Sequence, residues 1–292
     1  MTSVSADARS VWRFGAIGTV WAIETPHALP ALARDRVEGV IASFDAAWSR
    51  FRPDSVVSRL SREGGAVPAP PDATAMLDAY AELSSATEGA VNPLVGEALA
   101  KRGYDAEYSF TDRGAMPAPA AWRDLVTWSP EALALSEPAL LDVGALGKGR
   151  LVDLVVQALA PWAPADLVVD AGGDLAVRGA TQRIGLEHPF DARRAIGVVE
   201  VTDAALCASA TNRRAWGEGL HHVLDARTGV PVRTIAATWA IAPTAMRADA
   251  IATALFFDGG PRLAHEWGVE WVRMTTDGRV EWSPGSKAEL FT

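Results

Sequence analysis

The alternation of apolar and polar positions divides the chain into helix-like and strand-like segments. Residues 30–51 and 72–88 place apolar side chains at three- and four-residue spacing, which is typical of amphipathic helices. Residues 11–25 indicate a strand pair or a bulged strand, because apolar positions surround two glycines. The segment 65–71, GAVPAPP, is predicted to be a linker-like turn.

The rest of the chain combines short strands with few helices. Residues 147–160 predict a third long helix, and further helices are expected over about 245–258 and 260–267. Most of the pattern from 182 to 242 consists of short strands, including a single strand LHHVLD. Residues 105–123, rich in Ala and Pro, are expected to form an irregular surface excursion. Because strand runs and helix runs are segregated, we predict an α+β fold with a largely antiparallel sheet.

Composition excludes several classes of function. The 292 residues are 49% hydrophobic and 22% charged, enough for a sizeable core in one large domain or two. With a net charge of −9 and no basic run, neither nucleic acid nor an anionic membrane is an expected partner. The single cysteine, Cys207, excludes an intramolecular disulfide. We expect no membrane span and, since no signal peptide is recognised, a cytoplasmic location.

The segment MRADAIATALFF, residues 246–257, is the most informative candidate for chemistry. Asp249 and Thr253 are four residues apart and therefore share one face of a predicted helix whose other residues are apolar. Two hard oxygen ligands suit a small cation such as Mg²⁺, which leaves its other positions to water and phosphate oxygens. The alternative is that Asp249 caps or solvates the helix while Thr253 bonds to its own backbone.

A glycine-rich turn joins a predicted strand to the helix that starts near residue 147. In LDVGALGKGRLVD, Gly144, Gly147 and Gly149 allow a ligand to approach backbone amides closely, and Lys148 adds a positive charge. The N-terminus of the following helix favours anions. The glycine spacing matches neither a Walker loop nor GxGxxG, so the turn by itself does not identify a ligand.

A pair of adjacent histidines supplies a candidate base in HHVLDARTG, residues 221–229. Neighbours on a strand point to opposite faces, so only one of the two can face a given site. A neutral imidazole could take a proton from a nucleophile. A purely structural role for the histidine remains the alternative.

Seven segments in this order resemble the FAD:protein FMN transferase family, the ApbE-type flavin transferases. The resemblance implies a single domain over residues 1–292 with an α+β flavin-transferase, T-fold-like architecture that binds FAD and Mg²⁺. The matching segments are GAIGTVW at 15–21, FRPDSVVSRL at 51–60, EGAVNPLVG at 88–96, LDVGALGKGRLVD at 141–153, DAGGDLAVRG at 170–179, HHVLDARTG at 221–229 and ADAIATAL at 248–255.

The family's reaction cleaves the FAD pyrophosphate, attaches FMN to a Thr or Ser hydroxyl of an acceptor protein and releases AMP. By resemblance, the side chains of Asp249 and Thr253 and the carbonyl of Gly147 are the metal ligands. His222 matches the histidine best suited to deprotonate the acceptor hydroxyl. The residues that resemblance assigns to FAD binding are Ser55, Arg59, Tyr104, Asp142, Lys148, Asp225 and Thr228.

Four departures from the family pattern leave alternatives open, the first being GALGKG at 144–149 in place of GGIAKG. Ala208-Ser209-Ala210 replaces a TSG-type segment, Asn92 stands at the usual position of an aspartate, and Ala226 replaces a proline. One alternative is an FAD pyrophosphatase, in which water takes the place of the hydroxyl. The other is a non-catalytic FAD-binding protein.

Overall fold

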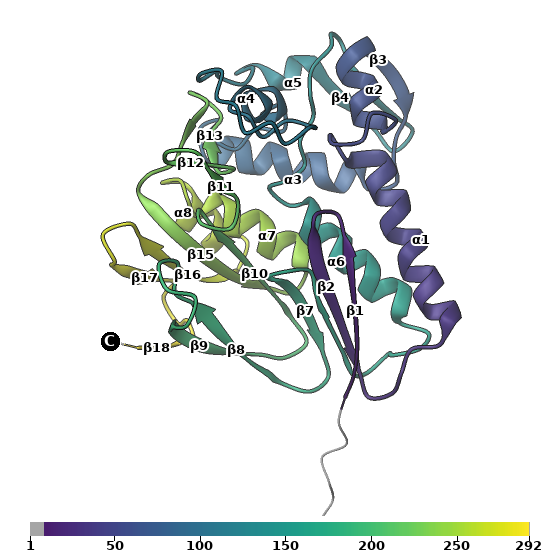
Figure 1. Cartoon of the computed structure of the whole chain (residues 1–292), viewed down its shortest axis with the longest axis vertical. Coiled ribbons are helices and arrows are strands. Elements are labelled where there is room, and N and C mark those ends of the chain that lie inside the picture. The colour runs from purple at the N-terminus through teal and green to yellow at the C-terminus, as the bar shows by residue number, and fades with distance from the viewer. Residues whose placement is uncertain (1–8, 292) are drawn as a thin grey trace, which may run out of the picture.

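An eight-stranded antiparallel sheet forms the centre of the molecule (Figure 1). The computed structural model describes residues 9–291. The cytoplasmic location was expected from the N-terminal segment, and residues 1–8 of that segment lie outside the described residues. Every neighbouring pair of strands in this sheet is antiparallel. In spatial order the strands are β1 (Ser10–Ala16), β2 (Thr19–Thr25), β6 (Leu167–Asp170), β7 (Asp174–Arg178), β10 (Ala205–Ala210), β15 (Ile235–Ala242), β16 (Glu270–Thr275) and β17 (Val280–Trp282).

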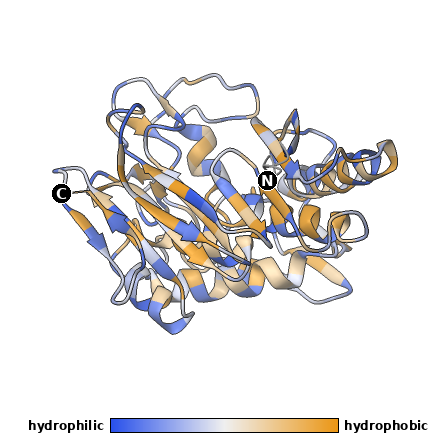
Figure 2. Cartoon of the chain, turned by 90° about the horizontal axis from the view of Figure 1, so that it is seen from below, coloured by the Kyte–Doolittle hydropathy of each residue, from blue (hydrophilic) through white to orange (hydrophobic). Residues whose placement is uncertain are grey.

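Helices cover one face of the sheet. Helix α7 packs on β10 and β15 and also against α6, which in turn contacts α1 (Figure 1). Figure 2 shows that hydrophobic residues are frequent on the strands and helices in the middle of the molecule. The helices are α1 (Ala31–Trp48), α2 (Val56–Glu63), α3 (Ala73–Ala86), α4 (Gly96–Lys101), α5 (Trp122–Leu125), α6 (Gly147–Leu159), α7 (Ala245–Ala254) and α8 (Gly260–Glu266).

A second, three-stranded sheet covers the other face. It comprises β8 (Gln182–Glu187), β9 (Ala195–Val201) and β18 (Glu289–Leu290). Trp239 of β15 packs toward this sheet, whereas the neighbouring Thr238 donates a hydrogen bond to the Ala252 carbonyl of α7 at 2.6 Å. Because both faces of β15 are covered, its sequence IAATWAIA is apolar almost throughout instead of alternating.

The predicted fold class is confirmed, together with the main helices and the strands of the central sheet. The linker prediction for GAVPAPP is wrong, because Gly65–Pro68 forms strand β3 and pairs with β5 (Ala132–Leu135), which also pairs with β4 (Val126–Trp128). Strand β3 lies at an edge of this small sheet, where a proline is tolerated.

Two predicted elements are shorter than expected. LHHVLD is not one strand but contributes to two ribbons, β11 (Ala215–Trp216) with β12 (Leu220–His221) and β13 (Leu224–Asp225) with β14 (Val230–Pro231). The helix expected over about 245–258 ends at Ala254. Across residues 9–291, no helix has both the length and the apolar character needed to cross a membrane.

The expected irregular excursion is largely irregular, but backbone hydrogen bonds fix it to the rest of the protein. The Phe110 amide donates to the Gly103 carbonyl at 2.8 Å, and the Ala118 amide donates to the Ala226 carbonyl at 2.7 Å. Helix α5 begins at Trp122, within the last part of this stretch. Residues 106–115 are exposed, as expected of a surface excursion, and Tyr108 and Phe110 among them also line a pocket.

Candidate functional site

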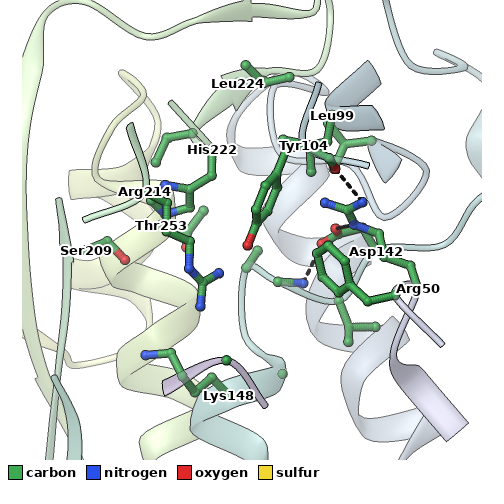
Figure 3. Close-up of a pocket in the computed structure, with 18 of the residues that line it drawn as sticks. Arg50, Leu99, Tyr104, Asp142, Lys148, Ser209, Arg214, His222, Leu224 and Thr253 are labelled. Atoms are coloured by element: carbon green, nitrogen blue, oxygen red, sulfur yellow. Dashed lines mark hydrogen bonds and ion pairs between the residues drawn. The ribbon is translucent and has the colours of Figure 1, made fainter. Parts of the chain in front are cut away.

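A pocket of about 730 Å³ opens beside the glycine-rich turn that precedes α6. Such a volume is typical of small-molecule and cofactor sites. Residues from distant parts of the sequence line this main pocket, and Figure 3 shows their side chains converging on it. Six of the predicted site residues line it: Tyr104, Asp142, Gly147, Lys148, His222 and Thr253.

Asp142 shapes the glycine-rich turn. One carboxylate oxygen accepts a hydrogen bond from the Gly144 amide at 2.6 Å, and the other accepts from Arg50 Nε, also at 2.6 Å (Figure 3). Arg50 donates in addition to the Tyr104 carbonyl at 2.7 Å. The side chain of Arg50 is only 3% exposed, so the charges of this pair are scarcely screened by solvent. Arg50 thereby joins the glycine turn to the opposite wall of the pocket.

Helices α6 and α7 place Lys148 and Asp249 next to each other. The α6 residue Asp153 accepts hydrogen bonds from the first amides of α7, Ala245 at 2.8 Å and Met246 at 2.9 Å. Four residues along α7, Asp249 accepts a hydrogen bond from the Gly149 amide at 2.8 Å. This reciprocal capping fixes the register of the two helices and directs Asp249 toward the N-terminus of α6.

Lys148 is paired with Asp174 of β7, and the carboxyl group of Asp249 is buried nearby. Burial raises the pKa of Asp249 well above its ordinary value, and the nearby carboxylate of Asp174 adds to the rise. The second carboxylate oxygen of Asp174, Oδ1, is buried and has no hydrogen-bond partner among residues 9–291. The positive charges of Lys148 and Arg214 oppose this rise in the pKa of Asp249.

Two of the three predicted metal ligands line the main pocket, whereas Asp249 does not. Thr253, one helical turn after Asp249, lines the main pocket, and Gly147 lies there at the start of α6. Within the described part of the chain, no three His, Cys, Asp or Glu side chains are grouped closely enough to hold a metal. A cation here would depend on hydroxyl, carbonyl, water and substrate oxygens besides one carboxylate, as is usual for Mg²⁺.

The two adjacent histidines have different environments. His221 is buried, and its ring bonds to the Val232 carbonyl at 2.8 Å and accepts from the Val223 amide at 3.3 Å. His222 lines the main pocket, and its Nδ1 atom is shielded and has no hydrogen-bond partner among residues 9–291. Burial, assisted by the positive charge of Arg214, lowers the pKa of His222 to about 3. His222 is therefore neutral at physiological pH.

Five aromatic residues form one side of the main pocket, here called the aromatic wall: Phe51, Tyr104, Tyr108, Phe110 and Trp216. The rings of Phe51 and Tyr108 are stacked, with centroids 5.1 Å apart, and those of Tyr104 and Trp216 are 5.5 Å apart. Tyr108 and Phe110 adopt positive φ angles of 51° and 49° and are about half exposed. Side chains held in this strained backbone conformation occur at ligand-binding sites more than elsewhere.

Four predicted FAD-binding residues do not line the main pocket. Ser55 is fully buried and caps α2 by accepting a hydrogen bond from the Ser58 amide at 3.1 Å, whereas Arg59 is exposed on that helix. Asp225 pairs with Arg227, and Thr228 donates to the Asp225 carbonyl, so both shape the turn after β13. Their contribution to FAD binding stays a prediction.

The departures from the family pattern have structural partners here. The Asn92 amide group donates to the Pro119 carbonyl at 2.9 Å and accepts from the Leu94 amide at 2.8 Å. Ala226 is buried, and its amide donates to the Ala90 carbonyl at 3.0 Å. Ser209, the one unchanged residue of its segment, lines the main pocket.

Sequence patterns missed three features of the site: Arg50, Arg214 and the Tyr108–Phe110 part of the aromatic wall. Arg50 directly precedes FRPDSVVSRL at 51–60, one of the segments that resemble the family. Its position next to that segment could therefore have indicated a residue of the site. Nothing in the local sequence distinguishes Arg214 from its neighbour Arg213. The two aromatic residues lie in a stretch whose Ala and Pro content favoured an irregular loop.

Comparison with known proteins gives consistent matches over most of the chain. The family model described as "ApbE family" matches residues 17–272. A Rhodobacter capsulatus protein named FAD:protein FMN transferase is 29% identical over 95% of this chain, and the match spans 57% of that protein's length. A Treponema pallidum protein of the same name is 28% identical over 92% of this chain and 85% of its own length.

Two solved structures have the same fold. An ApbE protein from Thermotoga maritima superposes with a TM-score of 0.80 at 21% identity, covering 94% of this chain and 97% of that one. The apo form of the Pseudomonas stutzeri flavinyl transferase ApbE also gives 0.80 at 21% identity, covering 97% of this chain and 96% of that one.

Proposed function

The chain belongs to the ApbE family, and we propose that it is an Mg²⁺-dependent FAD:protein FMN transferase. The observation that carries the proposal is the main pocket, which brings Lys148, His222 and Thr253 together opposite the aromatic wall. The pocket thus offers positive charge, a neutral imidazole and stacking surfaces to one ligand. A dinucleotide such as FAD presents both flat rings and a pyrophosphate.

In the proposed reaction, the hydroxyl oxygen of an acceptor Thr or Ser attacks the phosphorus of the FMN half of FAD. The bond from that phosphorus to the bridging oxygen breaks, and AMP leaves with the bridging oxygen. The hydroxyl proton passes to His222, which lines the pocket. A hydroxyl is a weak nucleophile until a base takes its proton, so this transfer is essential to the step.

We assign the metal site to Asp249, Thr253 and the Gly147 carbonyl. The spacing of Asp249 and Thr253 on one helix, and the position of Thr253 and Gly147 at the main pocket, support this assignment. Mg²⁺ bound there would offset the charge of the pyrophosphate oxygens, which otherwise repel a nucleophile. Lys148, held by Asp174 at the N-terminus of α6, contributes a fixed positive charge on the same side of the pocket.

The test is to incubate the protein with FAD and MgCl₂, with and without a small flavin-acceptor domain that carries a candidate Thr. Mass spectrometry would follow the acceptor and the nucleotides. We expect an acceptor mass gain equal to FMN and release of AMP. The assay would be repeated with several acceptor domains. If all of them stayed unmodified while free FMN and AMP were released, the protein would be an FAD pyrophosphatase. Intact bound FAD would indicate a binding protein without catalysis.

A further inference from the structure

We propose that Arg214 is the residue that binds the pyrophosphate of the dinucleotide in the main pocket. The identity of that ligand rests on the proposed function, but the inference about the arginine rests on its own geometry. Arg214 lies on the link between β10 and β11, a segment in which the sequence indicated no chemistry. The chemical class that it would recognise is a diphosphate ester.

The position of Arg214 places its charge at the polar end of the pocket. Its carbonyl accepts a hydrogen bond from the His222 amide at 3.3 Å, which ties the two backbone segments together. Figure 3 shows the guanidinium extending into the pocket between Thr253 and Lys148. Burial lowers the pKa of His222, and Arg214 is the charged group that contributes most to that effect. The guanidinium is therefore close to the atoms that the reaction requires.

Arg214 differs from the neighbouring cations because its side chain has no hydrogen-bond or ion-pair partner among residues 9–291. Arg50 is paired with Asp142, and Lys148 with Asp174. Arg213, the preceding residue, is paired with Glu187 at 3.1 Å. A partly buried guanidinium that points toward an ammonium is stabilised by an anion placed between them, and its planar donors match two phosphate oxygens at once.

The test compares ligands with and without a diphosphate on four proteins: wild type, Arg214→Gln, Arg214→Lys and Arg213→Gln. Binding of ADP and of riboflavin would be measured by calorimetry and by fluorescence. We expect Arg214→Gln to weaken ADP binding by roughly ten- to hundredfold, which is the usual effect of losing charge-assisted hydrogen bonds. Riboflavin affinity should stay unchanged, because riboflavin has no diphosphate. Arg214→Lys should give an intermediate loss, because lysine keeps the charge but not the planar fork.

Arg213→Gln is the matched control and should lower ADP affinity much less than Arg214→Gln does, since the Arg213 guanidinium is already bound to Glu187. Unchanged ADP affinity in Arg214→Gln would overturn the inference. An equal loss of ADP and riboflavin affinity would also overturn it, because it would indicate a distorted pocket; near-UV circular dichroism of each variant checks the packing. If wild-type protein binds ADP in an Arg214-dependent way but neither transfers nor hydrolyses FAD, the proposed function fails while the inference stands.

Discussion

Single charges in the main pocket depend on one another, and Lys148 is their common neighbour. It is paired with Asp174, and the buried carboxylate of Asp249 lies close enough to feel both groups. Removing one charge therefore changes the environment of the others. A substitution at Asp249 should therefore lower the activity and raise the stability of the protein. These opposite changes distinguish a catalytic role from a structural one.

We predict that Asp249→Asn lowers Mg²⁺-dependent turnover by roughly a hundredfold or more, because the charged ligand is lost. The pKa of Asp249 is higher in the folded protein than in the unfolded chain. At any pH above the ordinary pKa of an aspartate, this carboxyl group therefore destabilises the folded state. Without Mg²⁺ at neutral pH, the melting temperature of Asp249→Asn should therefore equal or exceed that of wild type. The measurements are turnover against magnesium concentration and thermal melts, with exposed Asp35→Asn as the control. Wild-type activity of Asp249→Asn at every magnesium concentration would refute the metal assignment.

His222→Ala should abolish transfer of FMN while FAD affinity changes little, because a base is not a binding anchor. The neighbouring variant His221→Ala should instead lower the melting temperature, since His221 bonds to the Val232 carbonyl inside the fold. Fluorescence titration with FAD and the transfer assay distinguish the two variants. A large loss of FAD affinity in His222→Ala would contradict the role of base.

The lowered pKa of His222 predicts a specific pH behaviour. The folded protein keeps this imidazole neutral down to about pH 3, whereas the unfolded chain takes up the proton near its ordinary pKa. Stability from this group is thus complete above the ordinary pKa and decreases as the pH falls toward 3. In the NMR spectrum of the ligand-free protein, the Cε1 proton of His222 should not shift between pH 5 and 8. The variant His222→Gln assigns the signal, and a midpoint near pH 6.5 would contradict the prediction.

At the scale of elements, the contact between α6 and α7 determines the geometry of the candidate metal site. Gly149 allows this contact, since a Cβ atom there would lie 2.7 Å from Asp249 Cβ and would overlap the Ala245 carbonyl. Both neighbours belong to α7, whose N-terminus is fixed to α6 by Asp153. A side chain at this position would therefore separate the helices.

We predict that Gly149→Ala lowers the free energy of unfolding by about 1–3 kcal/mol or more, because the helices must move apart. Gly39→Ala in α1 is the matched control, since a Cβ atom there has no neighbour within 4 Å. This control should stabilise the protein by about 0.5–1 kcal/mol, the usual gain from alanine in a helix. Urea denaturation of both variants measures the difference. Equal stabilities would show that the α6–α7 contact is looser than described.

At the scale of the whole molecule, one hydrophobic cluster draws residues from Trp21 near the start to Trp271 near the end of the chain. The smaller cluster between the main sheet and β8–β9 shares strands β7, β10, β15 and β16 with the first. These four strands cannot lose their packing without exposing both layers. This arrangement supports the proposal that the chain folds as a single domain.

We expect one cooperative unfolding transition, in which tryptophan fluorescence and far-UV circular dichroism change at the same urea concentration. The eleven tryptophans are distributed along the whole chain, so fluorescence reports on every layer. Two separated transitions would contradict the single-domain proposal. Repetition with the variant Leu186→Ala, which weakens the smaller cluster, shows whether the β8–β9 sheet unfolds with the rest.

By itself the sequence determined the periodic parts of the protein. The helices α1, α3 and α6 and the strand β15 follow from apolar spacing, because one face or both faces of each must be buried. The i, i+4 spacing likewise made Asp249 and Thr253 neighbours on one helix before any tertiary contact was considered. Local repetition suffices for such features, since the residues concerned lie within one element.

Only the tertiary structure decided which distant groups meet. It paired Lys148 with Asp174, directed His222 toward the pocket and left His221 in the interior. It also brought the aromatic wall together and made β3 a strand through its pairing with β5. Such outcomes depend on long-range contacts and on burial, which change the charge and the orientation of a side chain. Neither of them produces a periodic pattern in the sequence, so they could not be predicted from it.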